Sequence, residues 1–260
     1  MENFKNKKVV ISGGGSGIGK ELINQLYQEG TRDFAVIGRN KQKLVSLEST
    51  FPEANFILFS GNVADISDIS NFVNEVQNKW ETIDLLINNA GVVSAGELTT
   101  ITDEDIIQQV NINVTGLILM TKKFLPLLKH ESATAIINVS SNLALVGMPF
   151  YSPYAATKGA VKLFSEALRR ELQNEEIHVM TLYPTGTDTP MMKTAGAGTL
   201  QSTEMVVSKT LEGLRKNEID VMLGDMDAII ANRNNPQEFD KKAATMYESL
   251  KKGTEKHRAM

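Results

Sequence analysis

The fold class is indicated most directly by residues 8–30, KVVISGGGSGIGKELINQLYQEG. This stretch opens with a short β-branched apolar run, typical of a buried parallel strand, and closes with apolar side chains at helical spacing. The glycine run at 13–19 therefore predicts a strand-turn-helix unit, with Gly30 ending the helix. Such a turn lets a pyrophosphate approach backbone N–H groups at a helix N-terminus, where the helix dipole favours an anion. A simple turn is the alternative, and a P-loop is excluded because no Gly-Lys-Ser/Thr follows.

The second expected strand, Phe34–Ile37, ends at Gly38-Arg39-Asn40. Dinucleotide folds place the residue that contacts the adenosine ribose about 20 residues after the glycine turn, and an acidic side chain there binds the 2′-hydroxyl of NAD. Gly38 removes the acid, and Arg39 supplies a guanidinium that can bind a 2′-phosphate through two hydrogen bonds. We therefore expect NADP as the cofactor, with NAD as the alternative. An ordinary solvent-facing arginine would give the same local sequence.

Strand and helix patterns alternate along the rest of the chain. Further strands are expected at 55–60, 83–87, 135–140, 177–183 and 220–223, and helices at 66–79, 102–115, 154–174 and 205–216. This alternation predicts an α/β fold, a single Rossmann-type doubly wound parallel sheet with helices on both faces. No linker or low-complexity block interrupts the pattern, so we expect one NAD(P)-binding domain over residues 1–260.

Residues 225–260 are expected to form a helical C-terminal extension. Asn235-Pro236-Gln237-Glu238 is typical of a helix start, with an asparagine N-cap, a proline at the first position and a glutamate at the third. The apolar stripe of this helix comprises Phe239, Ala243, Met246, Tyr247 and Leu250. Such a stripe packs on its own domain, on a partner subunit or over the cleft, and these alternatives stay open.

The composition excludes several classes of protein. The chain has 260 residues, 42% of them hydrophobic, which suffices for a full core, and its net charge of −4 gives no basic surface for nucleic acid. The chain has no cysteine, which excludes thiol nucleophiles and cysteine-ligated zinc. The sequence shows no signal peptide and no apolar run of transmembrane length, so we expect a soluble cytoplasmic protein without a membrane partner. His130, His178 and His257 lack ligand spacing, so we expect no metal and a structural or surface role for each.

The segment from Asn138 to Lys158 offers a hydroxyl at Ser141, a phenol at Tyr154 and an amine at Lys158. Tyr154 and Lys158 are four positions apart, so on a helix they share one face. An adjacent cation favours the phenolate, and we therefore expect Lys158 to lower the pKa of Tyr154. A surface tyrosine near a lysine would produce the same short pattern by chance.

Five motifs occur in a fixed order between about residues 5 and 224. They are SGGGSGIG at 12–19, NNAG at 88–91, NVTG at 113–116, Ser141 thirteen positions before YAATK, and PTGTDT at 184–189. In this order they resemble the short-chain dehydrogenase/reductase family. The resemblance implies a catalytic tetrad of Asn113, Ser141, Tyr154 and Lys158. It also implies an oxidoreductase that transfers a hydride between NAD(P), with NADPH favoured, and a small carbonyl or alcohol substrate.

The resemblance also implies which residues contact the cofactor. They are Ser12, Gly13, Gly15, Ser16, Gly17, Ile18, Gly19, Arg39, Asn62, Val63, Asn89, Ala90, Gly91, Tyr154, Lys158, Pro184, Thr185, Gly186, Thr187 and Thr189. Three features depart from the family pattern. Thr185 stands where glycine is usual, Asn62 replaces an aspartate at the adenine contact, and the glycine turn lacks the basic residue that many NADP-binding members carry.

In the mechanism that the resemblance implies, Tyr154 donates a proton to the carbonyl oxygen and Ser141 orients that oxygen. Lys158 would hydrogen-bond the nicotinamide ribose, and Asn113 would anchor a water that links Lys158 to solvent. Residues 190–205 occupy the place of the family's substrate lid, where Met191 and Met192 would line an apolar pocket; a loose surface loop is the alternative.

The family usually assembles as homodimers or homotetramers through its long helices. Leu163, Phe164 and Leu168 would then serve such an interface, although a role in the core fits them equally. Two other functions remain on this fold. A nucleotide-sensing regulator would need no tetrad, and an epimerase usually has a longer substrate domain and a different glycine spacing.

Overall fold

Seven parallel strands form the central sheet, in the order β3-β2-β1-β4-β6-β7-β8. The computed structural model describes residues 1, 3–130, 132–196 and 199–260. The strand bounds are β1 Lys8–Ser12, β2 Asp33–Gly38, β3 Asn55–Ser60, β4 Leu85–Asn88, β6 Thr134–Val139, β7 Ile177–Tyr183 and β8 Asp220–Met222. All strands that the sequence predicts are present, three with the predicted bounds and the others with ends shifted by at most two residues. The expected fold class is therefore confirmed.

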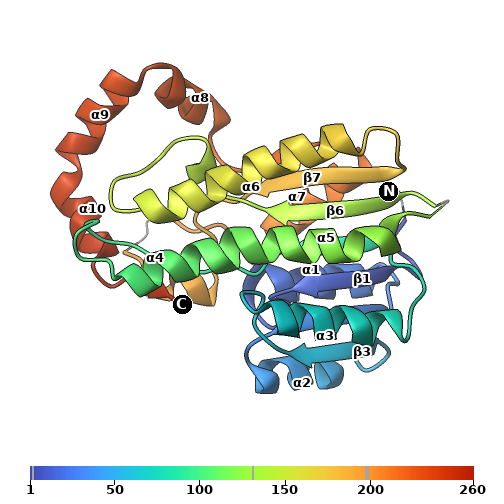
Figure 1. Ribbon diagram of the computed structural model, residues 1–260. Helices are drawn as coiled ribbons and strands as arrows, with labels where there is room; N and C mark the ends of the chain where they lie inside the picture. The colour runs from blue at the N-terminus through green and yellow to red at the C-terminus, as the bar shows by residue number, and fades with distance from the viewer. Residues whose placement is uncertain (2, 131, 197–198) are drawn as a thin grey trace.

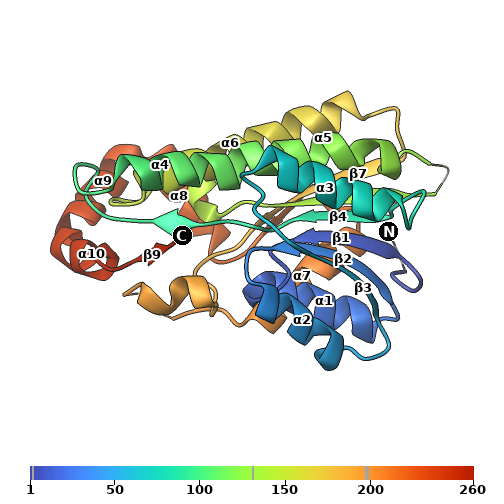
Figure 2. The same cartoon turned by 60° about the horizontal axis from the view of Figure 1, so that its bottom comes forward.

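Helices cover both faces of the sheet (Figures 1 and 2). One face carries α1 Gly17–Gln28, α2 Lys41–Thr50 and α7 Thr203–Arg215; the other carries α3 Ile66–Gln77, α5 Leu117–Leu128 and α6 Ser152–Glu171. Alternate residues of one strand enter different cores: Val9 and Ile11 pack with α1, whereas Val10 packs on the opposite side. Because both faces are buried, the central strands are apolar almost throughout, and the sequence shows this as continuous runs.

The order of the strands reverses at β1. The chain moves outward from β1 through β2 to β3, then returns to place β4 on the other side of β1. Ligands of open α/β sheets bind beyond the carboxyl ends of the strands at such a switch point. The glycine turn after β1 and the NNAG segment after β4 meet there, which positions the site described below.

The helix expected at 102–115 has an unexpected interruption. It begins with α4 Asp103–Val110, capped by Thr102, but passes through a π-helix at Asn111–Gly116 before α5 begins. A Cβ atom on Gly116 would overlap the carbonyl oxygen of Val63, so glycine allows a close approach here. Single π-turns inside α-helices frequently mark functional sites. Helix α2 was also not predicted, since only Leu44 and Leu47 of its ten residues are buried.

The C-terminal extension is helical, as expected, but differs in detail. It comprises α8 Met226–Asn234, α9 Pro236–Thr245 and α10 Tyr247–Thr254, which arch away from the sheet in Figure 1. Asn235 makes no side-chain cap; its amide donates to the carbonyl of Ala231 at 3.2 Å. Two residues of the predicted stripe are exposed, Met246 and Tyr247, which are 52% and 42% accessible, and the other three are half-buried. Tyr247 contacts the domain by packing its ring at a tilt against Phe150, with ring centroids 5.1 Å apart.

Beyond α10 the chain returns to the domain. A two-residue strand, β9 Arg258–Ala259, pairs antiparallel with β5 Val93–Ser94, which follows the NNAG segment. Arg258 also forms an ion pair with the buried carboxylate of Asp105 on α4. No helix within the described residues is long and apolar enough to cross a membrane.

Candidate active site

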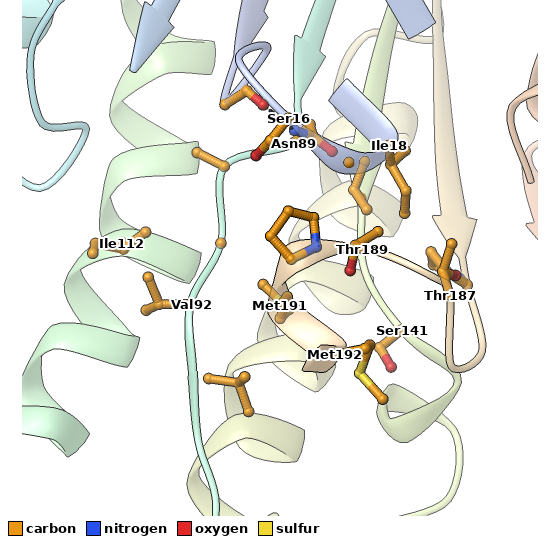
Figure 3. Close-up of a pocket in the computed structure, with 18 of the residues that line it drawn as sticks. Ser16, Ile18, Asn89, Val92, Ile112, Ser141, Thr187, Thr189, Met191 and Met192 are labelled. Carbon is orange, nitrogen blue, oxygen red and sulfur yellow. Dashed lines mark hydrogen bonds between the residues drawn. The ribbon is translucent and has the colours of Figure 1, made fainter. Parts of the chain in front are cut away.

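A cavity of about 580 Å³ lies along the carboxyl ends of the strands. In Figure 3, Ser16 and Ile18 from the start of α1, Asn89 after β4, and Thr189, Met191 and Met192 surround one space. Four of the five motifs contribute residues to this cavity, and the described residues that line it include none from NVTG, residues 113–116. The two halves of the chain thus line one continuous cavity.

The glycine turn fits a pyrophosphate. Gly13 and Gly17 adopt positive φ angles of 73° and 54°, which L side chains rarely adopt. Ser16 precedes α1, and its side chain forms no capping hydrogen bond. The first backbone N–H groups of the helix are therefore available to donate to a ligand in the cavity. No acidic residue occurs in this first turn. The end of the helix therefore presents donors and a positive dipole to an anion.

Ser12 and Asn89 hold the turn in place. The Ser12 hydroxyl accepts hydrogen bonds from the backbone N–H groups of Asn89 and Ala90, both at 3.1 Å. The Asn89 amide donates in return to the carbonyls of Ser12 and Gly13 at 3.0 and 3.1 Å. Neither Ser12 nor Gly19 lies among the described residues that line the cavity. Both were expected to contact the cofactor, and that expectation stays a prediction; in the structure Ser12 bonds to the NNAG segment and Gly19 lies against Gly13 and Asn89.

The adenosine end of the cavity carries two cations. Arg39 lines it as predicted, and Lys43 on the first turn of α2 lines it too. Asn40 caps α2 by accepting from the backbone N–H of Lys43 at 3.0 Å, which places this turn beside Arg39. Lys43 was missed because the sequence pattern of 41–50 is too weak to reveal the helix that carries it.

Asn62 and Val63 close this end from the tip of β3. The Asn62 side chain accepts from the backbone N–H of Ala64 at 3.0 Å, and its own backbone N–H donates to Asp68 at 2.8 Å. The amide is therefore held in one orientation at the cavity wall. Its free NH₂ group remains a donor for an adenine ring.

Ser141, Tyr154 and Lys158 meet at the opposite end. Ser141 ends the segment after β6, whereas Tyr154 and Lys158 lie on the first turns of α6, and all three line the cavity. Lys158 is buried, and its Nζ donates to the carbonyl of Val139 at 2.9 Å. The same Nζ lies 5.6 Å from the centroid of the Tyr154 ring. The sequence motif YAATK thus produces the shared helix face that its spacing predicts.

The pKa of Tyr154 differs from the expectation. Burial raises this pKa above its ordinary value, and the neighbouring hydroxyl of Ser141 opposes the rise without cancelling it. Burial also lowers the pKa of Lys158, to about 8. The predicted lowering of the Tyr154 pKa by Lys158 is therefore not found in this structure, where burial is the largest cause of the shift.

Asn113 is hydrogen-bonded to protein groups next to the cavity, and its expected role in holding a water stays a prediction. Its amide oxygen accepts from the backbone N–H of Val92 at 2.8 Å, and its NH₂ donates to the Val92 carbonyl and the Thr157 hydroxyl at 2.9 and 3.1 Å. Asn113 does not line the cavity within the described part of the chain. A Cβ atom on Gly91 would lie 3.4 Å from the Asn113 oxygen and 3.5 Å from Lys158 Nζ. The side chains of Asn113 and Lys158 therefore both reach Gly91.

The PTGTDT segment completes the cavity. All five of its expected contact residues line it: Pro184, Thr185, Gly186, Thr187 and Thr189. Thr189 packs across the glycine turn, 3.1 Å from where a Gly17 Cβ would be. Met191 and Met192 line the cavity as predicted (Figure 3). Residues 197–198 of the expected lid lie outside the described residues.

Two further cavity residues were not predicted. Tyr151 and His257 both line the cavity, and the Tyr151 hydroxyl lies 2.7 Å from Nδ1 of His257. His257 was expected to have a structural or surface role. Tyr151 could have been suspected from its position three residues before Tyr154, but no local pattern connects His257 to a cleft formed by distant residues.

Comparisons with known proteins agree with this geometry. A family model described as short chain dehydrogenase matches residues 7–199. The 3-ketodihydrosphingosine reductase of Dictyostelium discoideum is 30% identical over 206 residues, which are 72% of this chain and 62% of that protein. The chain thus spans less than two thirds of that relative.

Two solved structures share the fold over nearly their whole length. The short chain dehydrogenase/reductase from Burkholderia phymatum, in complex with NAD, has a TM-score of 0.81 at 22% identity, covering 93% of this chain and 96% of that one. The short chain dehydrogenase from Burkholderia cenocepacia, in complex with NADP, has a TM-score of 0.78 at 24% identity, covering 95% and 98%.

Proposed function

Since this chain belongs to the short-chain dehydrogenase family, we propose that it is an NAD(P)-dependent oxidoreductase acting on a small carbonyl or alcohol substrate, with NADPH preferred. One observation carries the proposal. A single cavity joins an anion-binding glycine turn to the hydroxyls of Ser141 and Tyr154 and the amine of Lys158. Residues 1–260 would act as one domain, because the C-terminal tail pairs with β5 and contributes His257 to the same cavity. We propose the cytoplasm as its location.

The residues of the cavity fit a dinucleotide. The N-terminus of α1 would hold the pyrophosphate, and Asn62 would donate to the adenine. Arg39 and Lys43 would hold a 2′-phosphate, which carries about −1.5 to −2 charge at neutral pH. Lys158, with one of its three donors used by Val139, would hydrogen-bond the nicotinamide ribose. The bound cofactor supplies the hydride for carbonyl reduction. The two neighbouring structures bind NAD and NADP respectively, which supports this class of ligand.

During reduction, negative charge develops on the carbonyl oxygen. The raised pKa of Tyr154 keeps its phenol protonated at neutral pH, so it enters the reaction as a proton donor. Ser141 would donate a hydrogen bond to the same oxygen and stabilise its charge. When Tyr154 has lost its proton, the charge on Lys158 stabilises the phenolate. Asn113 would act indirectly, because its hydrogen bonds hold Val92 and Thr157 in place near Lys158.

Titration of the protein with NADPH and NADH, followed by a carbonyl panel, tests the proposal. We expect tighter binding of NADPH and its oxidation by at least one ketone, aldehyde or sugar. The panel should include 3-ketodihydrosphingosine, because the Dictyostelium relative is named as its reductase. Cofactor binding without turnover on any carbonyl would instead favour a nucleotide-sensing protein.

Arg39→Ala is expected to raise the Kd for NADPH about 10- to 100-fold and to change the Kd for NADH less than twofold. The reason is that the guanidinium would donate charge-assisted hydrogen bonds only to the 2′-phosphate. Fluorescence titration measures both constants. Lys41→Ala is the matched control, since Lys41 carries the same charge on the same turn but is exposed and does not line the cavity. Equal weakening of both cofactors by Arg39→Ala would remove the argument for NADP.

We further propose a homodimer or homotetramer formed through the helical layer of α4 and α6. Leu163 on α6 is 64% exposed and Ile107 on α4 is 58% exposed, on helices that lie side by side in Figure 1. Of the three residues suggested by the sequence, only Leu163 is exposed enough to contact a partner subunit, because Leu168 is buried and Phe164 packs on the core. Exposed apolar side chains gathered on one layer favour association.

Leu163→Glu is therefore expected to shift the protein to the monomer, because a charge would have to be buried in the interface. Sedimentation velocity measures the mass. Val45→Glu is the control, since Val45 is 49% exposed on α2, on the opposite face of the sheet. A Leu163→Glu protein with the wild-type mass would place the interface elsewhere.

A further inference from the structure

A tyrosine and a histidine form a hydrogen-bonded pair beside the proposed catalytic group. The Tyr151 hydroxyl lies 2.7 Å from Nδ1 of His257, and both side chains line the cavity. The Tyr151 ring packs edge-on against the Tyr154 ring, with centroids 6.5 Å apart. A substrate carbonyl held at Tyr154 would therefore have Tyr151 next to it. No step of the proposed mechanism uses this pair.

His257 is held firmly although it lies near the C-terminus. Its backbone carbonyl accepts from Ala95 N at 3.0 Å, and its side chain is almost fully buried. The next residue, Arg258, binds the Asp105 carboxylate through two hydrogen bonds of 2.7 and 2.9 Å. Asp105 also accepts from the Ser94 hydroxyl at 2.9 Å. The β5–β9 pairing and this ion pair tie the tail to α4 and fix the imidazole in the cavity wall.

The contacts of His257 determine where its proton lies. Nε2 is 3.1 Å from the carbonyl oxygen of Met191, which can only accept, so Nε2 carries the hydrogen. Burial lowers the pKa of His257 and favours the neutral imidazole, in which Nδ1 is an acceptor. The Tyr151 phenol must then donate to Nδ1. Burial raises the pKa of Tyr151 to about 12, so the phenol stays protonated.

A hydroxyl has a single hydrogen and two lone pairs. Because the Tyr151 hydroxyl donates its hydrogen to His257, its oxygen can only accept a hydrogen bond from a molecule in the cavity. Ser141 and Tyr154 would both donate hydrogen bonds to a carbonyl oxygen. Tyr151 would add a hydrogen-bond acceptor at the same end of the site. The surrounding wall, which includes Val92, Met191 and Met192, is apolar.

We propose that Tyr151 is a substrate-binding residue that accepts a hydrogen bond from a hydroxyl or N–H group next to the reacting carbonyl, and that His257 is the positioning residue that sets its polarity. The substrate class is therefore a ketone or aldehyde with a donor on the adjacent carbon. This inference rests on the proposed function and narrows its substrates.

Matched ketone pairs test the role of Tyr151. The pairs are benzoin against deoxybenzoin and hydroxyacetone against butanone, which differ only in the donor. We expect wild-type kcat/KM to favour the hydroxyketone, and Tyr151→Phe to lower kcat/KM for hydroxyketones about five- to tenfold while changing it less than twofold for the partner ketones. An equal effect on both members of every pair, or no wild-type preference in any pair, overturns the inference.

Variants of His257 test the positioning role. His257→Gln keeps one acceptor for Tyr151 and one donor for Met191, so it is expected to retain most of the preference. His257→Leu leaves the phenol free to turn its hydrogen to the cavity, so the preference should disappear. A purely structural histidine would give equal losses for both substrates, and no rescue by glutamine.

A binding measurement separates this inference from the proposed function. With ¹⁵N-labelled histidine the spectrum contains three side chains, and His257→Gln identifies the relevant signals. In NADP⁺-loaded protein, benzoin should shift the His257 ring nitrogens and deoxybenzoin should not; in Tyr151→Phe the difference should vanish. A donor-specific shift without turnover of any carbonyl would refute the proposed activity alone. Turnover of these ketones without a donor-specific shift would refute the Tyr151 assignment alone.

Discussion

Tyr154→Phe is expected to lower kcat for carbonyl reduction about 10²- to 10⁴-fold, because it removes the proposed general acid and nothing else. The substitution removes only the hydroxyl, with its contacts to Ser141 and to the expected cofactor, and the phenyl ring keeps its edge-on packing against Tyr151 on α6. Binding of NADPH should therefore change less than about threefold. Single-turnover kinetics of cofactor oxidation, together with a fluorescence titration, give the two quantities separately.

Tyr183→Phe is the matched control for this variant. Tyr183 is a buried tyrosine on β7 whose hydroxyl donates to Asp220 at 3.1 Å, and it does not line the cavity. Loss of the Tyr183 hydroxyl should lower the free energy of unfolding by about 1 kcal/mol and leave kcat unchanged. If Tyr154→Phe retained most of its kcat, or if Tyr183→Phe lost as much, the assignment of the general acid would be wrong.

Gly19→Ala has the second large expected effect, a loss of stability together with cofactor binding. A Cβ atom there would overlap the carbonyl oxygen of Gly13 and lie 2.6 Å from the Asn89 amide nitrogen. Neither neighbour can move alone, because the Asn89 amide itself binds the Ser12 and Gly13 carbonyls. We expect the free energy of unfolding to fall by about 1–3 kcal/mol. NADPH binding should weaken at least tenfold, since the turn that receives the pyrophosphate is displaced.

Urea denaturation and NADPH titration measure these two effects. Gly147→Ala is the control, because a Cβ atom at Gly147 would meet nothing within 4 Å. That substitution should leave the free energy of unfolding within about 0.5 kcal/mol of the wild type. A Gly19→Ala protein as stable as the wild type would show that the turn can rearrange, contrary to the interlock seen here.

Local pattern was sufficient to predict the architecture and the family. The strands are continuous apolar runs because both faces of the sheet are buried, and this property is visible in a single sequence. Tyr154 and Lys158 were predicted to share a face because their spacing alone determines it. The single-domain assignment and the roles of the site residues stay predictions.

Features that depend on distant contacts could not be predicted. Ser12 and Gly19 occur within a recognised motif, yet their environment depends on Asn89, which reaches them only in the folded sheet. The β5–β9 pair comprises two residues on each strand, too short for any periodicity. His257 consequently carried no signal in the sequence. The shift in the Tyr154 pKa was misjudged because it depends on how much water the folded cavity excludes.

The π-helix at Asn111–Gly116 has an angular consequence for the long α4–α5 rod. Each residue of an α-helix advances by about 100°, so an uninterrupted helix would place Gln109 and Thr121 about 120° apart around its axis. One additional residue in the π-turn reduces this to about 20°. Both side chains are in fact buried. The extra residue thus corrects the rotational phase, so that α4 buries this side of the rod against β5 while α5 buries it against β4 and β6. A one-residue deletion there would turn α4 and Asp105 away from the tail.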